Sequence, residues 1–150
     1  MYDEDDLSLL DIEVELDSPL DHIEPLTAVT EVAKPDPDVM LALLENQQPQ
    51  QRMLAARAFC DIEDARAIPY LIHLLTDSCP LVRVSAAYGI GRNPSPLAVD
   101  PLIIQLNRDW NGYVRKGVVW ALGNCRDRRS LAPLADAFKN RYFRRAFVGC

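Results

Sequence analysis

A regular interval of about 32 residues recurs along the chain and constrains its fold more than any other feature. It separates successive members of these groups: Pro69, Pro101 and Pro133; Asp77 and Asp109; Val82 and Val114; Arg83 and Arg115; and Gly91 and Gly123. A weaker copy precedes them, in which Pro37 stands the same interval before Pro69 and Arg52 stands nearly that interval before Arg83. A unit of this length buries its apolar face only against the next unit. The chain is therefore predicted to be a stack of repeats.

Within each unit, the pattern predicts two helices joined by a short turn. A proline suits the opening turn of the first helix, since its missing N–H would have no partner there, and Asp100 is placed to cap the helix at Pro101. The first helices carry broad apolar stripes, and the second helices, about 81–90 and 113–122, carry small residues that let neighbours approach closely. Gly91 and Gly123 follow and are predicted to end the second helices in the left-handed conformation.

The pattern Pro-Leu, Leu, Asp-x4-Val-Arg and a closing Gly, present at 69–91 and 101–123, resembles the HEAT-like repeat of the phycobilisome lyase type of cyanobacteria. The resemblance covers residues from about 36 to 139 and implies an all-α fold, a right-handed α-α superhelix (HEAT-like solenoid) of three to four helix pairs. Repeats are expected at about 36–66, 67–98, 99–130 and 131–150, the last incomplete. The resemblance also implies a structural ladder between adjacent repeats, formed by Asp77, Arg83, Asp109 and Arg115.

The charge of the chain changes sign near residue 33. Residues 1–33 hold eleven acidic side chains and no lysine or arginine, a net charge of −11, while the rest holds sixteen basic and eleven acidic groups, giving +5 and a total of −6. Acidic segments interrupted by proline often bury too little surface to order. Residues 1–33 are therefore predicted to be mobile and residues 34–150 to form the repeat domain. The alternative is that the acidic segment lies against a basic groove of the body or of a partner.

Signals for export, membrane insertion and metal binding are weak. No apolar run approaches ~18 residues and the chain starts with Met1-Tyr2-Asp3-Glu4, so a cytoplasmic protein without membrane insertion is expected. The four cysteines lie far apart without a C-x-x-C pair, so reduced thiols and no metal are expected. A metal shared by Cys60 and Cys125 stays an alternative. The other two cysteines are Cys79 and Cys150.

The sequence carries no recognisable motif of catalysis. It contains no G-x-S-x-G, no Gly-rich phosphate loop and no H-E-x-x-H. Of the two histidines, His22 stands in the acidic segment and His73 in a first-helix apolar stripe, where a packed side chain is expected. No catalytic residue is assigned.

The third repeat and the residues that follow it carry the best candidates for contact with a partner. Interfaces favour amphipathic rings and arginines, which gives the predicted partner-binding set Trp110, Tyr113, Arg126, Arg128 and Arg129. The leading interpretation is a non-catalytic protein-interaction scaffold without a cofactor. A pI of about 4.8 disfavours nucleic acid as the partner.

Two other functions stay open. A phycobilin lyase subunit, which the resemblance implies, would hold an open-chain tetrapyrrole such as phycocyanobilin against a phycobiliprotein. Arg126 and Arg128 would then bind the propionates, and Trp110 and Tyr113 would form aromatic walls. An accessory partner of iron–sulfur cluster assembly proteins is the second alternative. The resemblance implies that role for some cyanobacterial HEAT-like proteins, and this chain carries thiols.

The fourth unit breaks the pattern. It begins as expected at 131–138, but position 147, where the arginine of the second helix belongs, holds Phe147. A divergent cap, a longer chain and a change of reading frame after Asn140 each explain this, and the longer chain is favoured. Without a covering repeat, self-association through the C-terminal edge is expected, involving Phe138, Phe143, Phe147 and Val148.

Overall fold

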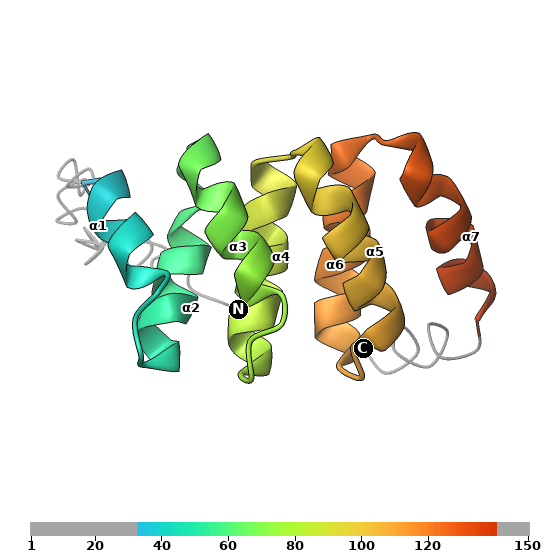
Figure 1. The fold of residues 1–150 in the computed structure, drawn as a ribbon, viewed down its shortest axis with the longest axis horizontal. Coiled ribbons are helices and arrows are strands. Elements are labelled where there is room, and N and C mark those ends of the chain that lie inside the picture. Colours follow the sequence, from blue (N-terminus) through green and yellow to red (C-terminus); the bar gives the residue numbers. More distant parts are fainter. Residues whose placement is uncertain (1–32, 141–150) are drawn as a thin grey trace, which may run out of the picture. The chain divides into compact units, whose positions relative to one another are not determined.

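The computed structural model describes residues 33–140, and every regular element within that range is a helix (Figure 1). The elements follow in the order α1 (Pro37–Leu43), α2 (Pro49–Ala58), η2 (Ala65–Ala67), α3 (Ile68–Leu74), α4 (Pro80–Arg92), η3 (Pro96–Ala98), α5 (Val99–Arg108), α6 (Gly112–Cys125), η4 (Arg128–Ser130) and α7 (Leu131–Lys139). The predicted all-α fold is confirmed. The expectations for the acidic segment and for Phe143, Phe147 and Val148 concern residues outside this range.

The helices pack as successive pairs. α1 packs on α2, α3 on α4 and α5 on α6, and the second helices α2, α4 and α6 also contact one another in turn. Figure 1 shows the pairs side by side in chain order. Such an arrangement is an α-solenoid, in which each unit supplies the surface that covers its neighbour. The handedness of the superhelix and the total number of repeats stay predictions.

Prolines open several helices, but not all those that the sequence predicts. α1, α2 and α4 begin at Pro37, Pro49 and Pro80. α5 begins earlier than its proline, at Val99, because a 3₁₀ turn leads into it, and Asp100 lies in its first turn without capping it. The prediction for Asp100 is wrong. For α3, α5 and α7 the side-chain caps stand instead at the start of the 3₁₀ turns that lead into these helices, at Asp64, Ser95 and Asp127.

The two glycines predicted to end the second helices lie inside them. α4 continues through Gly91 and α6 continues through Gly123. No glycine in residues 33–140 has a positive φ, and the left-handed residue after α6 is Arg126, with φ 49° and ψ 35°. The helix-cap prediction is therefore wrong for Gly91 and Gly123. At Gly91 the physical reason for the glycine is close packing, because a Cβ there would overlap the ring of Trp120.

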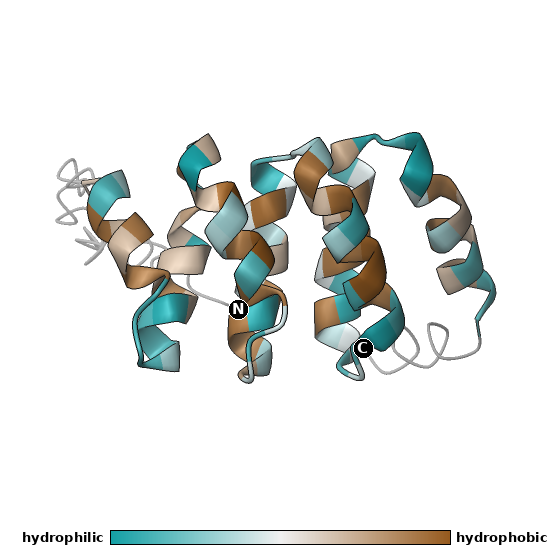
Figure 2. Ribbon diagram, in the orientation of Figure 1, coloured by the Kyte–Doolittle hydropathy of each residue, from teal (hydrophilic) through white to brown (hydrophobic). Residues whose placement is uncertain are grey.

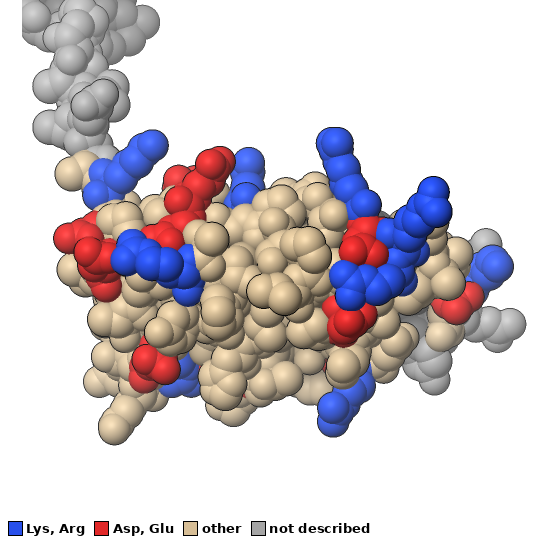
Figure 3. All heavy atoms as spheres, turned by 45° about the horizontal axis from the view of Figure 1, so that its top comes forward, with Lys and Arg blue, Asp and Glu red and all other residues tan. Residues whose placement is uncertain are grey.

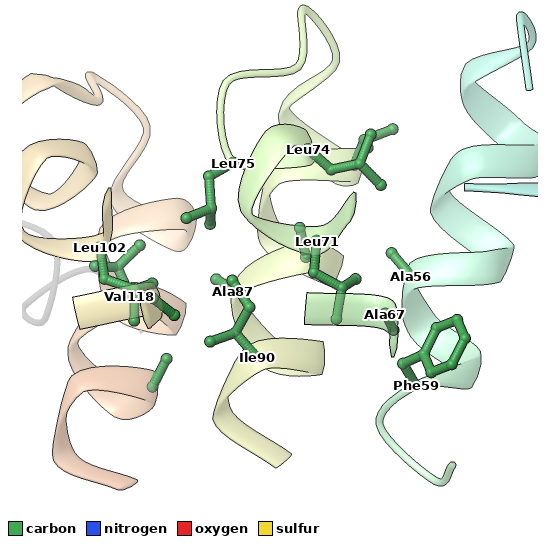
Figure 4. Close-up of a cluster of buried hydrophobic side chains, with 14 of the residues drawn as sticks. Ala56, Phe59, Ala67, Leu71, Leu74, Leu75, Ala87, Ile90, Leu102 and Val118 are labelled. Atoms are coloured by element: carbon green, nitrogen blue, oxygen red, sulfur yellow. The ribbon is translucent and has the colours of Figure 1, made fainter. Parts of the chain in front are cut away.

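The core runs through the stack between neighbouring repeats. Fully buried side chains come from each of the first three repeats, as Figure 4 shows for Phe59, Leu71, Ile90, Leu102 and Val118. Figure 2 shows hydrophobic residues alternating with hydrophilic ones along these helices, as expected where one side of each helix is covered. Burying a side chain of this kind stabilises the fold by about 1.5–3 kcal/mol. The repeats thus hold one another through shared apolar contacts.

A buried amide adds a polar link between the first and second repeats. The side-chain nitrogen of Asn93 donates to the carbonyl oxygens of Phe59 and Ile62 at 2.7 and 3.2 Å. Its side-chain oxygen accepts from the N–H of Asp64 at 3.1 Å. In the next repeat the corresponding position holds Cys125, whose thiol lies 3.8 Å from a carbonyl oxygen. Asn93 therefore closes the loop that leads from α2 to α3.

Candidate functional site

Two arginines each bind a carboxylate of the following repeat through both arms of the guanidinium. Nε of Arg52 lies 2.7 Å from Oδ2 of Asp77, and its Nη2 lies 3.1 Å from Oδ1. Arg83 holds Asp109 in the same way, at 2.8 and 3.2 Å. Paired bonds of this kind fix both distance and orientation. Each pair therefore sets the position of one repeat against the next, and Arg52 joins the series as the arginine of the weaker first copy.

Each arginine of the series is also anchored to its own turn. The same 2.8 Å bond from Nη1 to a carbonyl oxygen occurs three times, from Arg52 to Asn46, from Arg83 to Asp77 and from Arg115 to Asp109. In each turn, the side-chain oxygen at that carbonyl's residue also accepts a backbone N–H two residues further on. The three turns are therefore built in the same way. Each guanidinium is held by its own turn, independently of the carboxylate of the next repeat.

The carboxylates of this ladder stay ionised although they are buried. Desolvation acts to raise the pKa of Asp109, but hydrogen bonds from Arg83, Gln105 and a backbone N–H outweigh it and hold the pKa below its ordinary value. The same balance lowers the pKa of Asp77 beside Arg52. An arginine that holds such a carboxylate has its donors occupied. Arg52 and Arg83 therefore each join one repeat to the next through an ion pair.

The ladder stops at Arg115. This side chain keeps the anchor to its own turn, yet no carboxylate within residues 33–140 forms an ion pair with it. It lines a hollow of about 280 Å³ together with residues of α5 and α7. Of the four predicted ladder residues, the structure therefore pairs Arg83 with Asp109 and Asp77 with Arg52, and leaves Arg115 at the end of the series.

The outward sides of the second helices carry a row of large side chains, named here the second-helix surface. It consists of Leu54 on α2, Leu81 and Tyr88 on α4, and Tyr113 and Trp120 on α6. Leu81 and Tyr113 are 62% and 70% exposed. They occupy the same place in successive repeats, as do Tyr88 and Trp120, whose ring centroids lie 5.4 Å apart. Leu81 and Tyr88 are seven positions apart in α4, as are Tyr113 and Trp120 in α6. A spacing of seven positions returns to the same side of a helix, so the two residues of each helix lie on one side of it.

Comparison with known families decides what kind of chain this is. A family model for HEAT repeats matches residues 37–115, which is more than half of the chain. The chain belongs to the HEAT repeat family. A second model, for the PBS lyase HEAT-like repeat, matches residues 114–140 and confirms the predicted resemblance. No curated protein matches this HEAT chain.

The predicted partner-binding residues of the HEAT chain do not form one cluster. Trp110 and Tyr113 stand at the start of α6, 77% and 70% exposed, whereas the predicted arginines follow its end. A helix of 14 residues is about 20 Å long, so the two groups are separated by that length. The spacing in the sequence could not reveal this, because residues close in number lie at opposite ends of one helix. The three arginines concerned are Arg126, Arg128 and Arg129.

Arg129 is already engaged. It forms ion pairs with Asp127 and Asp100 at 2.8 and 2.9 Å, and these bonds with Asp127 lower the pKa of that carboxyl to about 2. In the face of the molecule that Figure 3 shows, basic and acidic side chains are interleaved toward both ends, and few charged side chains lie between them. Arg126 and Arg128 are exposed. Of the predicted arginines, these two can therefore reach a partner without breaking an ion pair of the described residues.

The cysteines of the described HEAT repeats are half-buried thiols. Cys60, Cys79 and Cys125 form no disulfide, and burial raises the pKa of Cys60 and Cys125. Within residues 33–140, no three His, Cys, Asp or Glu side chains lie close enough together to hold a metal ion. No helix in the same range is both long and apolar enough to cross a membrane.

Proposed function

We propose that this chain is a non-catalytic protein-interaction scaffold that binds a protein partner on the second-helix surface. The observation that carries the proposal is the exposure of Leu54, Leu81 and Tyr113, large apolar side chains that face outward from three successive second helices. Contiguous exposed apolar groups are costly in water and are typical of interaction sites. Tyr and Trp are also the residues that contribute most to binding at interfaces.

The centre of this surface is built for rigid contact. Trp120 lies against Gly91 and beside Tyr88, and the guanidinium of Arg92 lies 5.8 Å from its ring centroid. A ring held between a neighbouring helix and a cation loses little further freedom when a partner covers it. The ladder pair of Arg83 and Asp109 keeps α4 and α6 in fixed relative positions. The partner would therefore meet a preformed surface.

The proposal is tested by comparing two double variants. Leu81→Glu with Tyr113→Glu places charges on the second-helix surface, whereas Val39→Glu with Ile104→Glu places them on first helices at residues that are each 51% exposed. Proteins retained from lysate of the source cells by the unmodified chain would be identified, purified and titrated by calorimetry. We expect roughly tenfold or greater loss of affinity with the first variant only. Equal affinity for both variants would refute the proposal.

Phycobilin handling is the second candidate, supported by the PBS lyase HEAT-like match at residues 114–140. Arg126 and Arg128 are exposed in that segment and could bind propionates. The aromatic walls would have to come from elsewhere than Trp110 and Tyr113, which stand at the other end of α6. The test is to mix the purified chain with phycocyanobilin. A shifted, enhanced visible band that weakens in Arg126→Gln would favour this candidate over the scaffold.

The third candidate is an accessory partner of iron–sulfur cluster assembly proteins. Burial raises the pKa of Cys60 and Cys125, so these thiols are less ready to bind metal as thiolates. The test is whether the unmodified chain retains iron–sulfur cluster assembly proteins from lysate. Retention that is lost in Cys60→Ser or Cys125→Ser would support this candidate.

A further inference from the structure

Acidic and basic residues are distributed unevenly among the described helices. The second helices α2, α4 and α6 each contain two basic residues and no Asp or Glu. They are 10, 13 and 14 residues long, yet every acidic residue of the range 33–140 lies in a first helix or in a connecting segment. The helices that form the second-helix surface therefore carry positive charge alone.

Local helix preference does not explain why these helices lack carboxylates. The positive end of the helix dipole favours an acidic residue in the first turn, and the first helices α1 and α5 have Asp38 and Asp100 there. The first turns of α2, α4 and α6 contain none. In α4 and α6 they hold the exposed apolar residues Leu81 and Tyr113 instead. This points to a surface that accepts a negative group and does not repel it.

Two arginines stand among the aromatic rings of this surface. Arg57 on α2, Tyr88 on α4 and Trp120 on α6 follow one another at the repeat interval, so they form one row across helices that contact in turn (Figure 1). The rings of Tyr88 and Trp120 lie 5.4 Å apart. Arg92 ends α4, and its guanidinium lies 5.8 Å from the ring centroid of Trp120. The row thus begins with one cation and ends with an aromatic pair beside a second.

Arg57 and Arg92 have donors available for an incoming group. Both are exposed, and neither forms a hydrogen bond or an ion pair with another residue of the range 33–140. The exposed carboxylate of Asp61, which follows α2, lies near them, since burial and Asp61 raise the pKa of the Cys60 thiol while both arginines act to lower it. Two cations and one carboxylate leave a net positive charge. A carboxylate can therefore bind here without breaking an existing bond of the described residues.

We propose that the partner binds the second-helix surface through an acidic segment, in which large apolar side chains are flanked by Asp or Glu. This inference rests on the proposed function and adds the chemistry of the partner. The apolar side chains would pack on Leu81, Tyr88 and Trp120, which supply the exposed apolar area. The flanking carboxylates would bind Arg57 and Arg92 through paired hydrogen bonds, which a guanidinium favours.

A nucleic acid fits this surface less well. Single strands bind in positive grooves that follow the backbone, where each nucleotide carries one phosphate. Here Leu54 and Leu81 occupy positions that are 53% and 62% exposed. The other arginine of α2 and that of α4, Arg52 and Arg83, are each neutralised by an aspartate. Separate carboxylates on an apolar segment match this pattern, whereas a continuous row of phosphates does not.

The test uses the full chain and three fluorescein-labelled helical peptides that differ only in charge. The acidic peptide carries Leu and Trp along one side and Glu at the remaining positions, and the other two carry Gln or Lys in place of Glu. We expect fluorescence anisotropy to show the acidic peptide bound about tenfold more tightly than the Gln peptide, with the Lys peptide weakest. The preference should shrink as the ionic strength rises.

Matched double variants assign the preference to the two arginines. Arg57→Gln with Arg92→Gln should bring the affinity for the acidic peptide down to that for the Gln peptide. Arg108→Gln with Arg128→Gln removes the same charge from exposed arginines outside the second helices and should leave the preference unchanged. Circular-dichroism melts check that both variants fold. If the first does not, Arg57→Lys with Arg92→Lys keeps the charge without the planar fork and should retain only part of the preference.

Equal binding of the acidic and Gln peptides, or no binding of any peptide, would overturn the inference. The proposed function is tested separately with the captured partner. Equal binding of both peptides that Leu81→Glu with Tyr113→Glu abolishes would leave the second-helix surface in place and refute only the acidic partner. Tighter binding of a labelled oligothymidine than of the acidic peptide would assign the surface to nucleic acid and overturn the inference as well.

Two further results would replace the partner protein by the chain itself. One is a tenfold gain in affinity for the acidic peptide when the acidic residues of the segment 1–33 are changed to amides, since that segment would then be the competing occupant. The other is self-association in sedimentation velocity that Arg57→Gln with Arg92→Gln abolishes, which would show a second copy as the occupant. Unchanged affinity in the first experiment and a single species in the second are the expected results.

Discussion

At the scale of single residues, Gly91 and Gly123 occupy equivalent positions in successive repeats but differ in the space around them. A Cβ added to Gly91 would overlap the ring of Trp120, whereas a Cβ added to Gly123 would meet nothing within 4 Å. Gly91→Ala should lower the melting temperature, because overpacking costs about 1–3 kcal/mol and exceeds the gain in helix propensity. Gly123→Ala should raise it by relieving about 1 kcal/mol of helix cost. Circular-dichroism melts measure both, and shifts of the same sign would contradict this packing.

Asn93 offers a second residue-scale prediction. Asn93→Ala leaves the buried carbonyl oxygens of Phe59 and Ile62 without their donor, so the free energy of unfolding should fall by about 1–3 kcal/mol. Asn107→Ala removes an exposed amide bonded to a carbonyl within its own helix and serves as the control, with an effect below about 0.5 kcal/mol. Urea unfolding gives both values. A loss no larger than that of the control would mean that the bonds of Asn93 to the loop between α2 and α3 contribute nothing to stability.

At the scale of elements, the pair of Arg83 and Asp109 links α4 to the turn before α6. The side chains are only 9% and 1% exposed. Asp109→Asn would leave a buried guanidinium without a counter-charge, which costs about 3 kcal/mol. Asp136→Asn changes an exposed carboxylate outside the ladder and should cost little. Urea midpoints at pH 7 compare the two, and a small effect of Asp109→Asn would show that the ladder is dispensable.

The same pair predicts how stability depends on pH. The pKa of Asp109 is lower in the folded state than in the unfolded chain, so the unfolded state takes up the proton first as the pH falls. Its stabilisation is therefore complete above the unfolded pKa of about 4 and is lost as the pH falls through the lower folded value. The urea midpoint of the unmodified chain should decline in this window. Asp109→Asn should decline less steeply, and an unchanged slope would assign the effect to other carboxylates.

At the scale of the whole molecule, the repeat interval was enough to predict helix pairs, since residues one interval apart recur in the same helix of successive pairs and on the same side. The helix ends were not predictable from the same letters. Gly91 stands where a helix-capping glycine is expected, but it lies inside α4 and leaves room for the ring of Trp120. Only the packing of α4 on α6 shows which of these two roles the glycine has. Of the second-helix surface, Tyr113 was predicted from the sequence but Leu81 was not, because the exposure of Leu81 depends on where the neighbouring repeats leave it uncovered.

Stability should be distributed unevenly along the stack. No residue of α1 or α7 is fully covered, whereas α4 and α6 contribute buried residues that contact both neighbours. In a solenoid each unit is held by its neighbours, so the outer described helices should open more often than the inner ones. Hydrogen exchange followed by mass spectrometry should therefore show faster exchange in α1 and α7 than in α4 and α6. Uniform exchange across all four helices would instead indicate that they open as a single cooperative unit.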